Sequence, residues 1–191
     1  MRLVLIVLCF SLAVWPLLGR PSSARADTNI HERRAGQWSG GAGLGFLGNT
    51  PDGILEFAFN GHGDYFVHER LSIGPLAQYA GAGNDFLFGL SAQARYWWDI
   101  PGIAATRIVV QGGIGFVRAG IKDTDSGTAN TFSSFLIPIG IGIDHAVTER
   151  LSLTADLLLN FASLGETVRA RGRDFDLHTN LMPGFYVGIR F

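Results

Sequence analysis

Along most of this chain, apolar residues stand at every second position and alternate with small or polar ones. In the stretch from 86 to 98, one phase consists of Phe86, Phe88, Leu90, Ala92, Ala94, Tyr96 and Trp98. Between 135 and 143, one phase is Phe135, Ile137, Ile139, Ile141 and Ile143, and the other includes Pro138, Gly140 and Gly142. Alternation over this length is typical of strands with one apolar face and one small or polar face. The pattern therefore predicts an all-β protein.

Eight such segments follow one another. They span residues 36–47, 54–67, 71–80, 86–98, 107–120, 133–146, 151–163 and 178–191. The connections at 68–70, 99–106 and 147–150 are short or contain Pro101-Gly102, whereas those at 121–132 and 164–177 are long and polar. Short and long connections that alternate in this way predict an eight-stranded antiparallel up-and-down barrel.

The first residues have a different character. A basic start at Arg2 precedes an apolar run over 3–18, and small residues follow up to Ala24-Arg25-Ala26. This layout is typical of a cleaved secretory signal peptide. We therefore predict a signal peptide over 1–26, a flexible lead-in over 27–35 and a barrel over 36–191. The single cysteine, Cys9, lies in the signal peptide, so disulfides and thiolate sites are not expected in the exported chain.

Composition and charge decide which face of the barrel meets water. The chain has 191 residues, of which 47% are hydrophobic and 16% are charged, with 15 basic against 16 acidic side chains. Such a balance excludes the basic field of a nucleic-acid-binding protein. A soluble, lipocalin-like surface would be rich in lysine, but Lys122 is the only one. The pattern favours a transmembrane barrel with its apolar face toward lipid and its small and polar face toward the lumen.

Charged residues of both signs fall on the small and polar phase. They are Glu56, Asp64, Arg95, Arg107, Asp144, Asp156 and Arg190. We predict that these residues form a lumenal charge network in which Arg95, Arg107 and Arg190 pair with Glu56, Asp64, Asp144 or Asp156. The sequence leaves the individual pairs open.

Aromatic residues gather near the predicted strand ends, as in the interfacial girdles of membrane barrels. Near the short turns these are Trp38, Tyr65, Phe66, Tyr96, Trp97 and Trp98, and near the long loops Phe46, Tyr79, Phe86 and Phe161.

The last segment ends in an aromatic residue preceded by apolar residues at alternate positions, Phe185, Val187, Ile189 and Phe191. It resembles the C-terminal signal of Gram-negative outer membrane β-barrels that the barrel assembly machinery reads. With eight strands and a signal peptide, the chain resembles the small OmpA/OmpX-like and Opacity-like outer membrane proteins. The resemblance implies a location in the cell outer membrane, among its lipids and lipopolysaccharide. It also implies that the short turns are periplasmic and the long loops extracellular.

An eight-stranded barrel has an interior just wide enough for side chains to fill. We therefore expect a non-enzymatic protein with a structural or surface-interaction role. A narrow channel for small or hydrophobic solutes is the main alternative, and a lipid A-modifying enzyme is a third. No His-x-Ser-Asn or Gly-x-Ser-x-Gly motif is present, the five histidines show no metal-ligand spacing, and no cofactor is expected. Oligomeric state is left open.

The loop over 164–177 carries arginines at every second position, Arg169, Arg171 and Arg173. If the hairpin extends beyond the membrane, these share one face and can pair with lipopolysaccharide phosphates. A solvated charged hairpin is the simpler interpretation. The stretch from Lys122 to Gly127 superficially resembles a calcium loop, but it lacks the third ligand and the closing glutamate, so we expect a polar turn.

Overall fold

The computed structural model describes residues 35–50, 55–82, 85–103, 105–122, 129–163, 167–170, 173–176 and 181–191. The predicted signal peptide, nearly all of the lead-in, the acidic stretch after Lys122 and Arg171 lie outside these ranges. Within them, no helix is long and apolar enough to cross a membrane.

Ten strands make up the described chain. They are β1 (Trp38–Leu47), β2 (Glu56–His68), β3 (Leu71–Ala82), β4 (Asp85–Asp99), β5 (Thr106–Lys122), β6 (Ala129–Ala146), β7 (Ser152–Ala162), β8 (Thr167–Ala170), β9 (Arg173–Asp176) and β10 (Leu181–Arg190). Eight of them close into a barrel in the order β1-β10-β7-β6-β5-β4-β3-β2, and β8 pairs only with β9. All pairings are antiparallel, so the predicted eight-stranded up-and-down barrel is confirmed.

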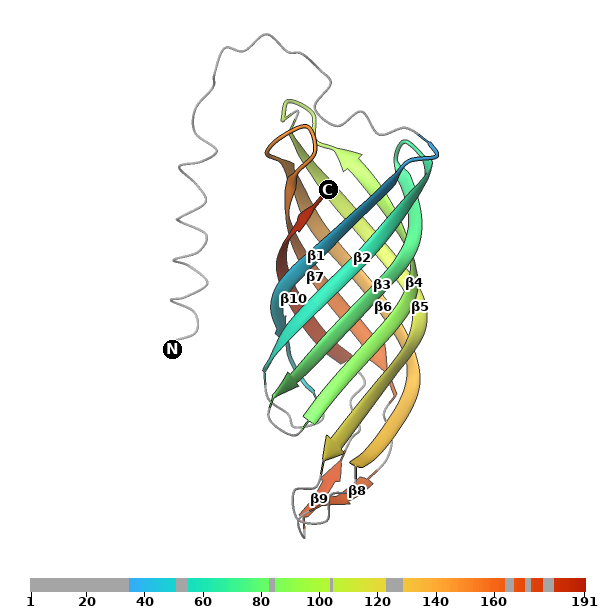
Figure 1. Cartoon of the computed structure of the whole chain (residues 1–191), viewed down its shortest axis with the longest axis vertical. Coiled ribbons are helices and arrows are strands. Elements are labelled where there is room, and N and C mark those ends of the chain that lie inside the picture. The colour runs from blue at the N-terminus through green and yellow to red at the C-terminus, as the bar shows by residue number, and fades with distance from the viewer. Residues whose placement is uncertain are drawn as a thin grey trace, which may run out of the picture.

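The barrel is closed by the first and last strands. Their register runs from Gly41 opposite Arg190 to Leu47 opposite Gly184. Beyond it, Gly40 and Phe191 exchange two backbone hydrogen bonds of 2.9 Å. The start of β1 and the end of β10 thus meet at the same end of the barrel, beside the short turns (Figure 1). Closure leaves none of the eight barrel strands with a free edge that could pair with another chain.

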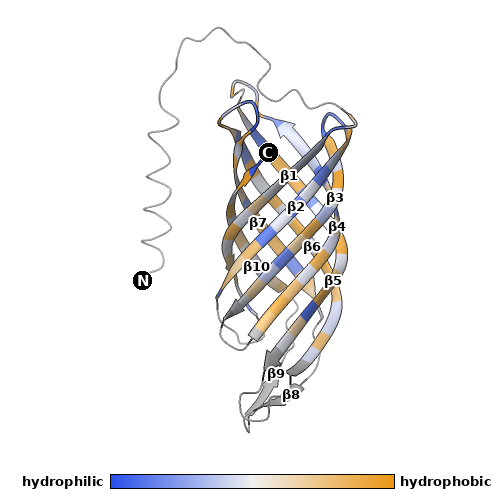
Figure 2. Ribbon diagram, viewed as in Figure 1, coloured by the Kyte–Doolittle hydropathy of each residue, from blue (hydrophilic) through white to orange (hydrophobic). Residues whose placement is uncertain are grey.

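Large apolar side chains point outward on every barrel strand. On β6, Ile139, Ile141 and Ile143 are 49 to 52% exposed, whereas Leu136, on the inward phase of the same strand, is 2% exposed. Hydropathy alternates in the same way along the other strands (Figure 2). Arg118 on β5 is the exception, an exposed arginine bonded to Thr131 toward the end of the barrel opposite the chain termini. A barrel with an apolar exterior and charged residues in its lumen has the arrangement of a transmembrane barrel, not of a lipocalin.

The prediction of an interfacial girdle is wrong for two of its aromatic residues. Phe66 and Trp97 are each 2% exposed and lie in the lumen beside Val109, with their ring centroids 5.7 Å apart. Both stand near strand ends, but both also occupy the inward phase of their strands, and the phase decides which way a side chain points. Trp38, Tyr96 and Trp98 are exposed, as a girdle requires.

The connection over 164–177 contains more structure than its prediction as a polar loop. It holds the hairpin of β8 and β9, with Thr167 opposite Asp176 and Ala170 opposite Arg173. The hairpin extends past the barrel at the end opposite the termini (Figure 1).

Candidate functional site: the polar belt of the lumen

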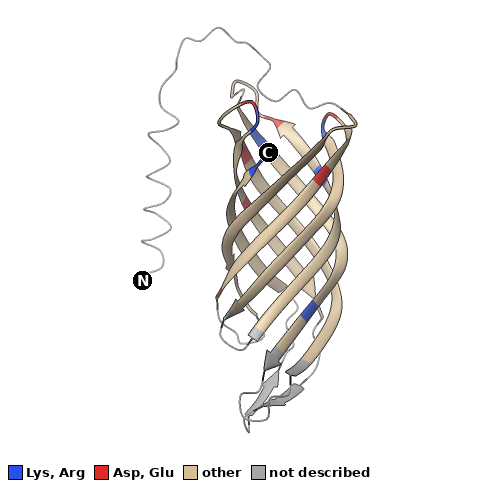
Figure 3. Cartoon of the chain, viewed as in Figure 1, with Lys and Arg blue, Asp and Glu red and all other residues tan. Residues whose placement is uncertain are grey.

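Charged residues of the barrel gather toward the end where β1 begins and β10 ends (Figure 3). There the inward phase of all eight barrel strands supplies polar side chains to one connected set, which we call the polar belt. It comprises Ser39, Asp64, Ser72, Arg95, Trp97, Gln111, Asp144, Ser152, Asp156 and Arg190.

One part of the belt is built around Arg95 on β4. Its Nη1 lies 2.8 Å from Oδ2 of Asp64, and its Nε donates to Oε1 of Gln111 at 2.8 Å. The hydroxyl of Ser72 donates to the other oxygen of Asp64 at 3.0 Å. Gln111 then donates to Asp156 at 3.3 Å. This part therefore links strands β2, β3, β4, β5 and β7.

The other part is built around Arg190 on β10. Its Nε and Nη2 donate to the two oxygens of Asp144 at 2.7 and 3.0 Å, a bidentate pair. The remaining donors reach Ser39 at 3.1 Å and Ser152 at 3.2 Å. The side chains of Arg190 and Asp144 are 5 and 1% exposed, so both charges depend on each other for the solvation that water would otherwise supply.

Trp97 joins the two parts. Its indole nitrogen donates to the hydroxyl of Ser72 at 3.0 Å, and its ring lies 4.9 Å from the guanidinium carbon of Arg190. A guanidinium over an indole ring at this distance is an attractive cation–π contact. The belt is therefore continuous across the lumen, and it joins strands that are not sheet neighbours: β2 to β4, β5 to β7, and β10 to both β6 and β4.

His62 on β2 lies beside the belt, with its Nε2 3.6 Å from Oδ2 of Asp64. Three buried polar atoms of this region have no hydrogen-bond partner among the described residues: His62 Nδ1, Ser91 Oγ and Gln93 Nε2.

The rest of the lumen is filled by an apolar layer, which we call the apolar plug. It comprises Leu47, Ala58, Leu76, Ala80, Leu87, Val117, Ala119, Leu136, Leu158, Ala162, Met182 and Tyr186, from all eight barrel strands, and each is at most 3% exposed. Within this part of the lumen, the amides of Gln78 and Asn160 bond each other at 2.9 and 3.1 Å, and the Tyr186 hydroxyl donates to Gln78 at 3.3 Å. These three polar side chains thus bond one another, and Asn160 also donates to the backbone oxygen of Met182 at 3.3 Å.

The predicted charge network is only partly brought together. The belt contains Asp64, Arg95, Asp144, Asp156 and Arg190. Arg107 donates to Asp99 at 2.7 Å at the rim, where the side chain of Asp99 is 56% exposed; Asp99 was not among the expected partners. Glu56 is buried at the other end of β2, where it stands opposite Leu47.

Five belt members were missed from the sequence: Ser39, Ser72, Trp97, Gln111 and Ser152. All five are uncharged, so a search for charges passes over them. Their inward phase was the signal that could have found them, because a buried arginine needs neutral acceptors as well as a carboxylate.

The residues predicted as an assembly signal all point outward. Phe185, Val187, Ile189 and Phe191 are 50, 49, 44 and 69% exposed. Of the loop arginines, Arg169 lies on β8 opposite Asp174, and Arg173 lies on β9. The structure does not describe the side chains of these arginines, so their contact with lipopolysaccharide stays a prediction.

The described residues hold no group of three or more histidine, cysteine or acidic side chains that could bind a metal ion. The belt carboxylates Asp64 and Asp144 are engaged by arginines. Filled lumen, apolar wall and closed antiparallel topology together define the class: a small transmembrane β-barrel whose interior is packed with side chains.

Solved structures place the chain more specifically within this class, although no known protein family and no curated protein matches its sequence. Neisserial surface protein A is similar with a TM-score of 0.61 and 16% identity, over 80% of this chain and 94% of that one. The N-terminal barrel domain of Pseudomonas aeruginosa OprF has a TM-score of 0.50 and 17% identity, over 80 and 97%. Ail, the attachment invasion locus protein of Yersinia pestis, has a TM-score of 0.51 and 13% identity, over 81 and 96%. The chain has the fold of these small outer membrane barrels.

Proposed function

We propose that the chain is an integral protein of the Gram-negative outer membrane that has no catalytic activity. Its role is structural, or it acts through contacts made at the cell surface by the loops that include β8 and β9. The observation that carries the proposal is the filled lumen: the polar belt and the apolar plug each draw side chains from all eight barrel strands. A protein whose interior is occupied in this way has its outer surfaces left for function.

The known barrels of the same fold support a surface role. One is named a surface protein and another an attachment invasion locus protein. For this chain, the partners would be outer membrane lipids, lipopolysaccharide at the long-loop end and the barrel assembly machinery at the last strand. The outward row Phe185, Val187, Ile189 and Phe191 is available for that last contact during assembly.

Two measurements test this proposal. Fractionation of cells expressing the full chain should place it in the outer membrane, in a form whose electrophoretic mobility changes on boiling, as folded barrels do. In planar bilayers, the purified protein should show no steady conductance above that of bare membrane. Stable single-channel steps would instead support the narrow channel, and a changed lipid A mass spectrum on expression would support the lipid-modifying enzyme.

A further inference from the structure

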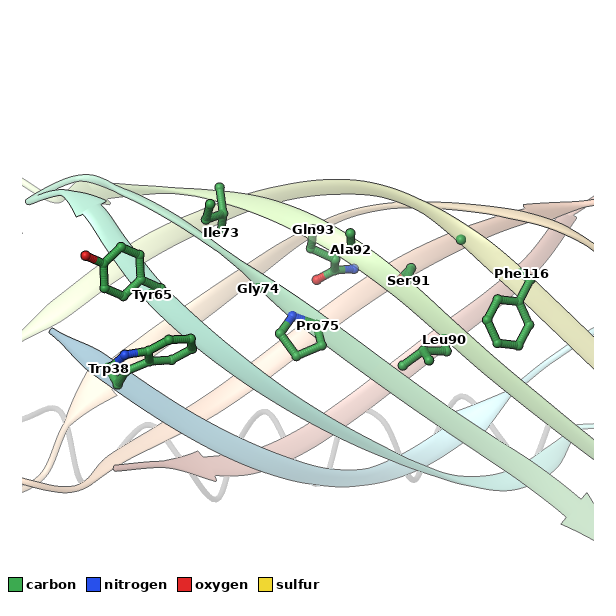
Figure 4. A pocket seen from close by; sticks show the side chains of 11 residues that line it. Trp38, Tyr65, Ile73, Gly74, Pro75, Leu90, Ser91, Ala92, Gln93 and Phe116 are labelled. Atoms are coloured by element: carbon green, nitrogen blue, oxygen red, sulfur yellow. The ribbon is translucent and has the colours of Figure 1, made fainter. Parts of the chain in front are cut away.

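A long apolar groove lies on the outer wall of the barrel, across β1 to β5. It has a volume of about 890 Å³. Figure 4 shows Trp38 and Tyr65 side by side at one end, Leu90 and Phe116 at the other, and Pro75 between them. The large side chains that line the groove, such as Trp38, Ile73 and Phe116, are exposed on the outward face, and four residues of the inward phase line it between them: Gly74, Ser91, Gln93 and Gly115. The groove therefore opens to the surface that faces lipid.

Small outward residues on adjacent strands form the floor. Pro75 on β3 stands opposite Ala92 on β4. On β2, Gly63 lies beside the same proline, since a Cβ atom added to this glycine would come within 3.7 Å of the Pro75 ring. Larger side chains on both sides of this row, such as Ile73 and Leu90, make the walls. The hollow is thus a consequence of which residues share a row across the strands.

The groove extends over about one leaflet of a membrane. Trp38 begins β1 and Tyr65 is near the end of β2, so one end of the groove is at the barrel end that holds the termini. Leu90 is eight residues along β4 from the exposed Trp98. At ~3.3 Å per residue and a strand tilt of ~40°, this is roughly 20 Å along the barrel axis, close to the middle of a hydrocarbon core ~30 Å thick.

We propose that this groove binds the acyl chains of one phospholipid from the leaflet at the termini end of the barrel. The proposal rests on the proposed outer membrane location and adds a specific lipid partner to it. The groove is lined mainly by apolar side chains and extends from the interface to about the middle of the hydrocarbon core, which is the path that the acyl chains of one leaflet follow.

The aromatic pair at the outer end of the groove suits a lipid headgroup. The rings of Trp38 and Tyr65 lie 5.1 Å apart, and Trp38 is 72% exposed. Indole and phenol groups prefer the membrane interface because one side of each is apolar and the other carries a hydrogen-bond donor. The chains enter the groove beneath these rings, and the headgroup stays within reach of their N–H and O–H.

A flexible lipid fits the groove better than a second copy of the barrel. In a twofold dimer both subunits use the same surface, so the two hollows would face each other and enclose a larger void. Two convex barrel walls also touch along a narrow line. Acyl chains can follow a hollow that a rigid wall leaves empty.

The test uses the full-length protein in vesicles of phosphatidylethanolamine and phosphatidylglycerol. A fraction of the phosphatidylethanolamine carries a photoreactive diazirine near the end of one acyl chain. After illumination, mass spectrometry of the digested protein locates the label. We expect several-fold more label at Leu90 and Phe116 than at Ile141 and Leu157, which are exposed at mid-strand on the opposite wall.

Ala92→Leu fills the floor of the groove and should bring labelling at Leu90 and Phe116 down to the level of the opposite wall. Ala155→Leu is the control: it is the same substitution on the outer face of β7, between Val187 and Ile143, and should change nothing at the groove. Equal labelling around the wild-type barrel, or groove labelling that survives Ala92→Leu, overturns the lipid site and leaves the proposed function intact. Failure of the wild-type chain to insert overturns both.

Discussion

The guanidinium of Arg190 lies over the indole ring of Trp97, 4.9 Å from its centre, and this contact connects two ion pairs that would otherwise be separate. On one side the ring nitrogen leads through Ser72 to Asp64, and on the other the arginine holds Asp144. The last barrel strand is thereby attached to β4, on the far side of the lumen. Cohesion across the interior does not depend on the sheet hydrogen bonds alone.

Replacement of one partner of the Arg190–Asp144 ion pair should lower the free energy of unfolding more than replacement of both. Arg190→Leu leaves Asp144 buried without its counter-ion, and loss of one member of a buried pair costs about 3–5 kcal/mol. Arg190→Leu with Asp144→Leu removes the stranded charge and should recover much of that loss. The measurement is the free energy of unfolding in urea from lipid vesicles. Equal destabilisation of the single and double variants would show that the pair is not the source.

Arg95 and Arg107, both members of the predicted network, should contribute unequally to the free energy of unfolding. Arg95→Leu strands the buried Asp64 and should lower the free energy of unfolding by about 3–5 kcal/mol. Arg107→Leu breaks a pair whose carboxylate, on Asp99, is largely exposed, and should cost under about 1 kcal/mol because water replaces the lost partner. The same urea titration ranks them. A larger effect at Arg107 would contradict the placement of the belt.

Arginine at two adjacent positions of β6 should disturb the barrel for two different reasons. Ile139→Arg puts a charge on the lipid face near mid-membrane and should cost about 2–4 kcal/mol. At Gly140, even a Cβ atom would lie 2.5 Å from Leu158 and 2.6 Å from a backbone oxygen of Leu157, so Gly140→Arg should prevent barrel closure.

Single cysteines distinguish the two faces directly. In a chain without Cys9, cysteines at Ile139 and Ile141 should react with a lipid-phase probe, and a cysteine at Leu158 should not. Reaction of Leu158→Cys, with the two isoleucine positions protected, would mean that the two faces of the sheet are reversed, with the isoleucines in the lumen and Leu158 toward lipid.

Phe191 offers a way to separate two contributions to assembly. Its backbone closes the barrel against Gly40, whereas its exposed ring belongs to the outward row of the last strand. Deletion of Phe191 removes both, while Phe191→Ala keeps the backbone bonds. If the ring is the assembly signal, both variants should be exported but accumulate as unfolded, protease-sensitive protein. Normal insertion of both, judged by heat-modifiable mobility, would exclude a role for this residue in assembly.

The fold could be predicted because strand phase is a property of adjacent residues. The alternation around Ile139 and Gly140 fixed which face of β6 was apolar, and closure followed from the number of strands. Contacts between side chains in the lumen were harder to predict, because the distance between the two residues of a pair depends on barrel shear and side-chain length. Arg107 and Asp144 stand opposite each other across β5 and β6, yet Arg107 bonds the rim residue Asp99 on β4. Trp97 shows the same limit: its place near a strand end suggested an interfacial role, and its phase placed it in the lumen.

The apolar plug has a consequence for how the connections between the barrel strands can change in evolution. All of its described members come from the eight barrel strands themselves. A connection that is lengthened, shortened or exchanged while the strands stay intact should therefore leave the barrier across the lumen in place.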